Sequence, residues 1–126
     1  MKALWEAVQV RQCEAADAGF DWPDVHGVLD KLREEVGELA EAAVLPEGDE
    51  CRARCLHELG DLLFVLAHLS RRLEADPEVA LEQALMRFNA RFSEVMRNAD
   101  QLPPLGDPSR LEVMEARWKA AKRRGL

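Results

Sequence analysis

The amino-acid sequence predicts an all-α protein, and three observations support this prediction. The 126 residues include only 7 glycines and 6 prolines, so long helices can run without interruption. Apolar residues recur at spacings of three and four, which places them on one face of a helix. Sustained alternation of apolar and polar residues, the pattern of a half-buried strand, is absent. We therefore expect a bundle of about five helices in a single domain spanning residues 1–126.

Helix boundaries follow from glycine, proline and capping residues. Gly19 is suited to end the first helix, because glycine adopts the left-handed conformation that often terminates helices. Asp76-Pro77 and Asp107-Pro108 each place a capping aspartate before a proline in the first helical turn. The expected helices are Ala3–Ala18, Asp24–Val44, Glu50–Leu73, Pro77–Asn98, and a last one from Pro108 into the basic stretch Lys119–Arg124.

The composition excludes several classes of function. The chain carries 17 Lys+Arg against 24 Asp+Glu, a net charge of −7, which disfavours duplex nucleic acid as a partner. Its apolar runs are far shorter than the ~20 residues of a membrane span, and the N-terminal sequence lacks a secretory signal. The 3 cysteines form an odd set without secretory context, so we expect reduced thiols and a cytoplasmic location. An acidic chain can still bind a phosphorylated small molecule through a metal cation.

The expected third helix has a distinctive apolar character. Between Leu59 and Leu69 it is apolar nearly all round, which indicates a central, buried helix. Together with the apolar fourth helix, this predicts that a lone protomer would expose too much apolar surface. We therefore expect a homodimer or a homotetramer.

Two pairs of carboxylates carry the chemical signal. Glu35 and Glu38 are three residues apart on the expected second helix, and Glu58 and Asp61 have the same spacing on the third. Residues three apart share a helix face. If these helices pack antiparallel, as their short connection suggests, four carboxylates converge.

Asp61 is the most informative of the four, because it interrupts an apolar helix with few basic residues in register. A buried carboxylate needs a cation or must take up a proton. A ligand set made only of oxygen atoms suits Mg²⁺, with Mn²⁺ as a substitute, and Mg²⁺ commonly binds substrate phosphates. The pattern thus favours metal-assisted cleavage of a phosphoanhydride. The alternative for Glu35 and Glu38 is a solvated helix face.

Around these acids the sequence resembles the MazG-type nucleotide pyrophosphohydrolases over about residues 5 to 120. The resemblance is carried by five segments, in chain order: Gly19–Pro23, Leu32–Leu39, Glu58–Phe64, Ala80–Phe92 with its Arg87-Phe88 and Arg91-Phe92 pairs, and Leu111–Trp118.

The resemblance implies a four-helix core completed by oligomerisation, and hydrolysis of nucleoside triphosphates to the monophosphate and pyrophosphate. It implies Mg²⁺ held by Glu35, Glu38, Glu58 and Asp61. Glu34 and Glu35 become candidate catalytic residues, with Glu34 helping to position a metal-bound water. House-cleaning of non-canonical nucleotides is a frequent role in this family, and a preference for deoxyuridine triphosphate is a narrower possibility.

Three further residues are candidates for substrate binding. Arg87 and Arg91 lie four apart on one helix face, where guanidinium groups could contact phosphates or simply form a surface. Trp22 could stack on a nucleobase, or pack in the core or a dimer interface.

The sequence also departs from the family pattern. Glu14 and Asp17 stand where a basic residue is expected, Leu85 replaces a frequent asparagine, and Arg87 replaces a lysine. These changes keep open a second interpretation, a non-catalytic helical module that serves dimerisation or partner binding.

Overall fold

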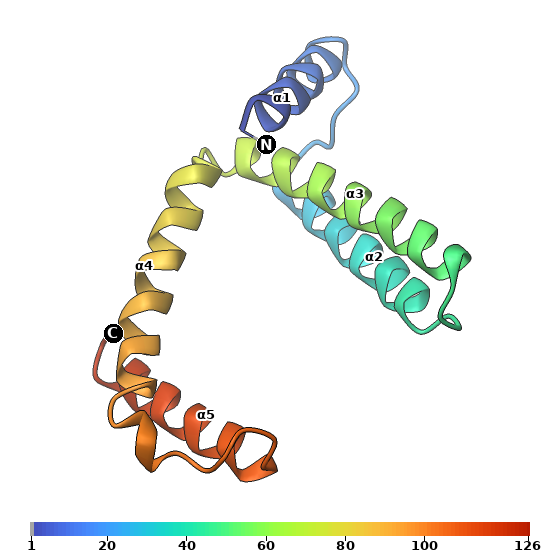
Figure 1. The fold of residues 1–126 in the computed structure, drawn as a ribbon. Coiled ribbons are helices and arrows are strands. Elements are labelled where there is room, and N and C mark those ends of the chain that lie inside the picture. Colours follow the sequence, from blue (N-terminus) through green and yellow to red (C-terminus); the bar gives the residue numbers. More distant parts are fainter. Residues whose placement is uncertain (1) are drawn as a thin grey trace. The chain divides into compact units, whose positions relative to one another are not determined.

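The computed structural model describes residues 2–126, which form five α-helices and one short 3-10 helix, with no strand (Figure 1). The all-α prediction is confirmed. The chain divides into two compact units, an N-terminal unit that ends at Pro77 and a C-terminal unit, Glu78–Leu126. The prediction of one domain over the whole chain stays a prediction. The elements are α1 (Lys2–Asp17), α2 (Val25–Ala43), α3 (Asp49–Arg72), α4 (Pro77–Val95), η1 (Ala99–Gln101) and α5 (Pro108–Arg123).

The helix ends follow the sequence signals closely, with one difference. Gly19 has φ +91° and ends α1, with backbone hydrogen bonds of 2.9 and 2.8 Å closing the last turn. Asp24 and Asp107 cap α2 and α5 through their side chains. The expectation that α4 continues to Asn98 was wrong, because Asn98 adopts a left-handed conformation with φ 53° and the chain continues into η1.

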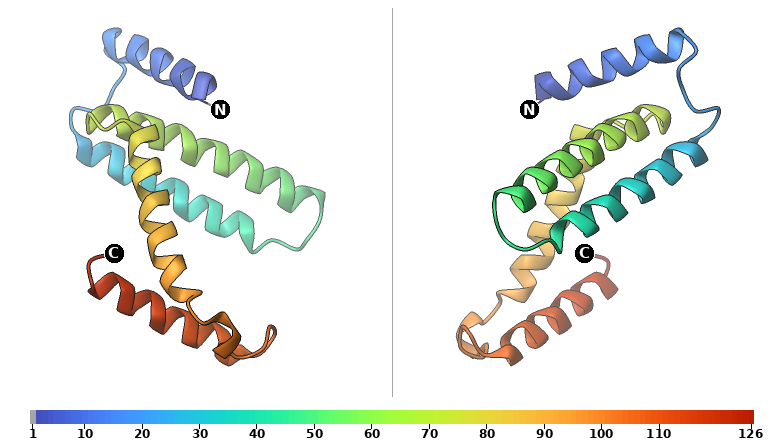
Figure 2. Two further views of the ribbon diagram at one scale, coloured as in Figure 1. Left: turned by 60° about the vertical axis from the view of Figure 1, so that its left-hand side comes forward. Right: turned by 90° about the vertical axis from the view of Figure 1, so that its right-hand side faces the viewer.

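In the N-terminal unit, α2 and α3 lie side by side as an antiparallel hairpin, and α3 lies between α1 and α2 (Figures 1 and 2). Small and β-branched side chains form the core of this hairpin, since apolar residues at helical spacing meet between the two helices. The fully buried apolar residues of α2 and α3 are Val28, Ala42, Val65 and Ala67.

α3 is central in this unit, as predicted, but part of its apolar surface is not buried there, in line with the expectation that a lone protomer exposes apolar surface. Leu59 is 45% exposed and Phe64 is 50% exposed. Two neighbouring helices cover only part of the circumference of α3, so its remaining face is open within the N-terminal unit. A small apolar pocket of about 190 Å³ also lies between α1 and α3, bordered by Gly60 of α3.

Two glutamines join α1 to α3. The side-chain amide of Gln9 donates to the carbonyl oxygen of Ala67 at 3.1 Å, and that of Gln12 donates to the carbonyl of Phe64 at 2.9 Å. Gln12 is buried, so its amide nitrogen needs this acceptor.

The connection between α1 and α2 is tied to the end of α3 by a polar cluster centred on Asp21. Its carboxylate accepts hydrogen bonds from Arg71 at 3.2 Å, Arg72 at 3.1 Å and the backbone N–H of Trp22 at 2.7 Å. Nε2 of His68 lies 2.9 Å from Oδ1 of Asp21. The rings of His68 and Trp22 also meet at right angles, with centroids 5.0 Å apart.

Opposing effects set the ionisation of this cluster. Burial would raise the pKa of Asp21, but the hydrogen bonds from Arg71 and the Trp22 backbone outweigh it and lower the pKa. Burial and then the charge of Arg71 lower the pKa of His68. A pKa below the usual 6.5 leaves the imidazole mainly neutral at pH 7. Its Nε2 lies within hydrogen-bond distance of both Oδ1 of Asp21, at 2.9 Å, and Nη2 of Arg71, at 3.2 Å.

The C-terminal unit is a hairpin of α4 and α5 joined by aromatic contacts. The Phe88 ring lies 5.6 Å from that of Phe92 and 5.5 Å from that of Trp118, between centroids. The guanidinium of Arg91 lies 5.4 Å from the centre of the Trp118 ring, in a cation–π arrangement.

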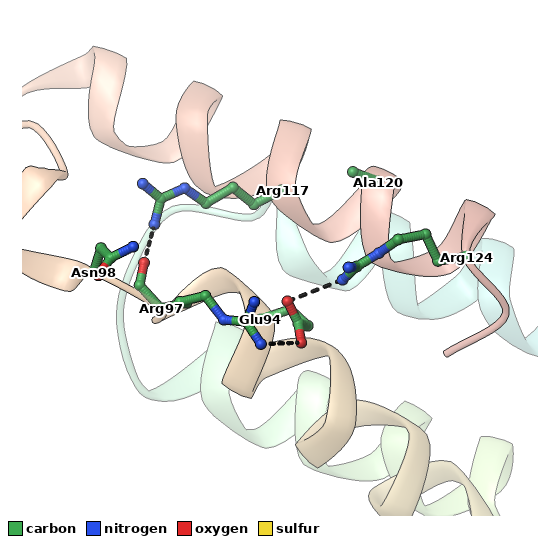
Figure 3. A pocket seen from close by; sticks show the side chains of 6 residues that line it. All are labelled: Glu94, Arg97, Asn98, Arg117, Ala120 and Arg124. Carbon is green, nitrogen blue, oxygen red and sulfur yellow. Dashed lines mark hydrogen bonds and ion pairs between the residues drawn. The ribbon is translucent and has the colours of Figure 1, made fainter.

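Arginines also line a pocket of about 270 Å³ in this unit, and each of them has a partner in the hairpin (Figure 3). Arg97 and Arg124 share the carboxylate of Glu94, at 3.0 and 2.9 Å. Arg117 donates to the carbonyl oxygens of Val95 and Arg97 at the end of α4. These contacts satisfy helix-end carbonyls and stabilise the hairpin.

Across residues 2–126, every helix falls short of the length and apolar content that a membrane span requires. The three cysteines are free thiols, as expected; Cys13 is exposed, and Cys51 and Cys55 are half-buried.

Candidate metal centre

The antiparallel hairpin of α2 and α3 brings carboxylates of both helices together. Glu35, Glu38 and Glu58 each offer one oxygen, and these oxygens lie within 4.8 Å of one another. A second group with the same spacing consists of Glu58, Asp61 and His57. Glu58 belongs to both groups, so the four acids form one continuous series, here called the seam. Glu35, Glu38 and Glu58 join the two helices, whereas Asp61 is grouped only with residues of its own helix, α3, and its sharing of one site with Glu35 and Glu38 stays a prediction.

Burial distinguishes the members of the seam. Glu35 is 4% exposed and Glu58 is 7% exposed, whereas Glu38 and Asp61 are half-buried. One oxygen of Glu35 and one of Glu58, Oε2 in each case, is buried without a hydrogen-bond partner among the described residues. A buried acceptor without a partner costs about 1–3 kcal/mol and more when charged, so these oxygens suit a ligand from outside the chain.

The carboxylates also repel one another. The charge of Glu35, then burial, then the charge of Glu58 raise the pKa of Glu38 above its usual value. A divalent cation among these oxygens would remove that repulsion. The glutamate group contains oxygen donors alone, which suits a hard cation such as Mg²⁺ or Mn²⁺.

Two basic side chains contact the seam. Nζ of Lys31 lies 3.0 Å from Oε1 of Glu35 and 3.4 Å from Oε1 of Glu34. Nε2 of His57, on an exposed side chain, lies 3.2 Å from Oδ2 of Asp61. Both contacts join residues one turn apart on the same helix, so neither of them links α2 to α3.

Comparison with known proteins places this hairpin in a family. Residues 24–98, more than half of the chain, match the family model of the MazG nucleotide pyrophosphohydrolase domain. The chain belongs to this family. The matched segment contains both carboxylate pairs of the MazG domain, on α2 and α3.

Named relatives agree with the family assignment. The MazG domain is 37% identical over 111 residues to a nucleoside triphosphate pyrophosphohydrolase/pyrophosphatase MazG of Thermotoga maritima, covering 88% of this chain and 41% of the relative. It is 36% identical over 128 residues to a nucleoside triphosphate pyrophosphohydrolase of Escherichia coli K12, covering 100% of this chain and 47% of the relative. The chain thus spans less than half the length of these relatives.

The remaining candidate residues of the MazG domain are not members of the two acidic groups. Glu34 is exposed on α2 and contacts Lys31. Trp22 lies beside His68, two helical turns beyond Asp61 on α3, and its carbonyl oxygen accepts a hydrogen bond of 2.8 Å from Arg72. These contacts are sufficient to explain why Trp22 is half-buried, so its burial does not require a ligand.

Arg87 and Arg91 belong to α4 in the C-terminal unit. Arg87 is exposed, whereas Arg91 donates from Nε to the carbonyl oxygen of Leu126 at 2.8 Å. Their assignment to phosphate binding stays a prediction.

Sequence reasoning missed the roles of three residues. Lys31 and His57 each stand four positions before a seam carboxylate, a spacing that predicts an ion pair on a helix. In the sequence Asp21 stands out only as part of a motif, because its three side-chain partners, Arg71, Arg72 and His68, come from distant positions that no local pattern reveals.

Proposed function

We propose that this MazG domain is a Mg²⁺-dependent nucleoside triphosphate pyrophosphohydrolase that acts in the cytoplasm and releases the monophosphate and pyrophosphate. One observation carries the proposal, the convergence of the Glu35, Glu38 and Glu58 oxygens within 4.8 Å, with buried oxygens left without partners. The two relatives, both named nucleoside triphosphate pyrophosphohydrolases, support the substrate class.

The residues of the seam fit a hard divalent cation. Glu35, Glu38 and Glu58 would hold the cation. Asp61, which is grouped with Glu58, would be the fourth ligand. When bound, Mg²⁺ supplies charge neutralisation for the phosphates and activates water, and Mn²⁺ would substitute for it.

The chain's own groups would then orient the reaction. Glu34 is exposed beside Glu35, so its carboxylate can orient the attacking water and accept its proton. The buried carboxylates of Glu35 and Glu58 fix the position of the site, because their helices are locked by packing. Arg87 and Arg91 are the candidate phosphate contacts, and Trp22 the candidate contact for the base.

A nucleotide panel tests this proposal. Standard, deoxy and oxidised triphosphates are incubated with the protein, with and without Mg²⁺, and pyrophosphate is measured. We expect metal-dependent release with at least one nucleotide, and a loss of about 10²-fold or more in Asp61→Asn at unchanged helical content. Full activity in that variant would refute the assignment of Asp61.

The panel also addresses the choice of substrate. A preference for oxidised bases would support house-cleaning of non-canonical nucleotides. A preference for deoxyuridine triphosphate would support the narrower alternative.

A second candidate function is a non-catalytic interaction module. The departures at Glu14, Asp17 and Leu85 favour it, since acidic or apolar groups stand where phosphate or base contacts are expected. Absence of pyrophosphate release over the whole panel would support this module.

We also propose that the protein is a homodimer or a homotetramer. Several large apolar side chains are exposed on α4, including Leu81, Leu85 and Met86. Light scattering after size-exclusion chromatography measures the mass directly, and a monomer of 14.2 kDa would contradict this proposal.

A further inference from the structure

Lys31 places a positive charge against the candidate metal centre. Its ammonium group lies 3.0 Å from Oε1 of Glu35, a carboxylate that is 4% exposed. The lysine side chain is itself only 35% exposed. This contact therefore differs from the exposed helix pairs of the chain, which water screens strongly.

The two oxygens of Glu35 have different surroundings. Oε1 faces Lys31, whereas Oε2 is buried without a partner among the described residues. The same carboxylate lies within 4.8 Å of oxygens of Glu38 and Glu58. Lys31 thus offsets the negative charge of Glu35, which the neighbouring carboxylates of Glu38 and Glu58 repel.

We propose that Lys31 is a resident counter-ion of the carboxylate seam. Its ammonium group stabilises Glu35 when no divalent cation is bound and opposes the cation when one arrives. This inference rests on the proposed metal centre. Its consequence is a trade-off, in which Lys31 stabilises the metal-free fold at the expense of affinity for Mg²⁺.

The first test measures Mg²⁺ binding to the full chain by calorimetry, without nucleotide and at low ionic strength. Lys31→Met should bind Mg²⁺ about three- to tenfold more tightly than the wild type, since one repelling charge is gone. Lys31→Arg keeps the charge and should match the wild type. Arg33→Met is the matched control, because Arg33 lies on the same helix and pairs with the exposed Asp30.

The second test needs no metal. In excess chelator, Lys31→Met should unfold at a lower temperature than the wild type. In a Glu35→Gln background the same substitution should have little effect, because the carboxylate that Lys31 neutralises is absent.

The outcomes separate the two proposals. Equal or weaker Mg²⁺ binding in Lys31→Met, with binding intact in the wild type, overturns the role of Lys31 alone. The same holds if Arg33→Met tightens binding equally, or if the effect on unfolding persists in Glu35→Gln. An absence of Mg²⁺ binding in every chain overturns the metal centre and this inference with it.

Discussion

Glu38 shows how a single side chain can serve a site at a cost to the fold. Its carboxylate is half-buried beside Glu35 and Glu58, and their charges hold its pKa above the usual value. Above that pKa the folded chain carries a repulsion that the unfolded chain lacks, so the ionised form lowers stability. Residues kept at such positions are commonly those that function requires.

Glu38→Gln should therefore stabilise the metal-free protein and weaken its response to Mg²⁺. The substitution removes the repelled charge, which raises the unfolding temperature in chelator, and removes one candidate ligand. Glu41→Gln is the control, because Glu41 is exposed on the same helix. A lower unfolding temperature in Glu38→Gln than in Glu41→Gln would contradict this prediction.

His68 gives a prediction about acid stability. Its folded-state pKa lies below the usual 6.5, so the unfolded chain takes up a proton first as pH falls. Stability is then present above pH 6.5 and declines as the pH falls through 6.5 toward the lowered pKa. Asp21, also with a lowered pKa, adds a further loss only below about pH 4.

Urea unfolding at pH 7.5, 6 and 5 measures this effect. We expect the wild type to lose more stability over this range than His68→Gln, which has no titrating ring. Comparing the two chains cancels the contribution of other groups. Equal losses in both chains would show that His68 does not set the acid response.

At the scale of the element, two glycines of α2 have opposite surroundings. A Cβ atom added at Gly37 would meet nothing within 4 Å. One added at Gly27 would lie 2.5 Å from Cδ1 of Trp22, whose ring packs against His68 and whose backbone carbonyl accepts a hydrogen bond from Arg72. The first glycine costs helix stability without a packing reason, while the second makes room for a side chain.

Gly37→Ala should accordingly stabilise the fold by up to about 1 kcal/mol. Gly27→Ala should destabilise it by about 1–3 kcal/mol, because the tryptophan must move. The two variants share chemistry and helix, so chemical denaturation of each against the wild type isolates the effect of the surroundings. The same sign of change in both would contradict the packing at Gly27.

The elements also show what a sequence can and cannot predict. Helix type, the cap at Asp107 and the shared face of each carboxylate pair follow from local sequence signals, because helical periodicity fixes which residues share a face. The Asp21 cluster could not be predicted, since its arginines lie about fifty positions away. The apolar character of α3 predicts that a lone protomer exposes part of it, but which residues stay exposed could not be predicted, because apolarity alone does not say what covers a helix.

At the scale of the whole molecule, the candidate metal centre lies entirely within the N-terminal unit. Mg²⁺, if it binds there as proposed, would stabilise the folded form by mass action, by about 2.7 kcal/mol at a hundredfold excess over Kd. Trp5 and Trp22 belong to this unit, and Trp118 belongs to the other. Fluorescence can therefore follow the unit that holds the carboxylates.

We expect Mg²⁺ to raise the unfolding temperature reported by tryptophan fluorescence in a Trp118→Phe background. Adding Glu58→Gln should remove the shift, because Glu58 belongs to both ligand groups. A shift that survives Glu58→Gln would place the bound ion elsewhere.

The pair of glutamine contacts between α1 and α3 has a mechanical consequence. Gln9 donates to Ala67 and Gln12 donates to Phe64, so the donors and the acceptors are both three residues apart and run in opposite directions along the chain. Sliding α1 by one residue, about 1.5 Å, would pull both amides off their carbonyls together. The two contacts therefore favour one register of α1 against α3, since a slide in either direction would break both of them at once.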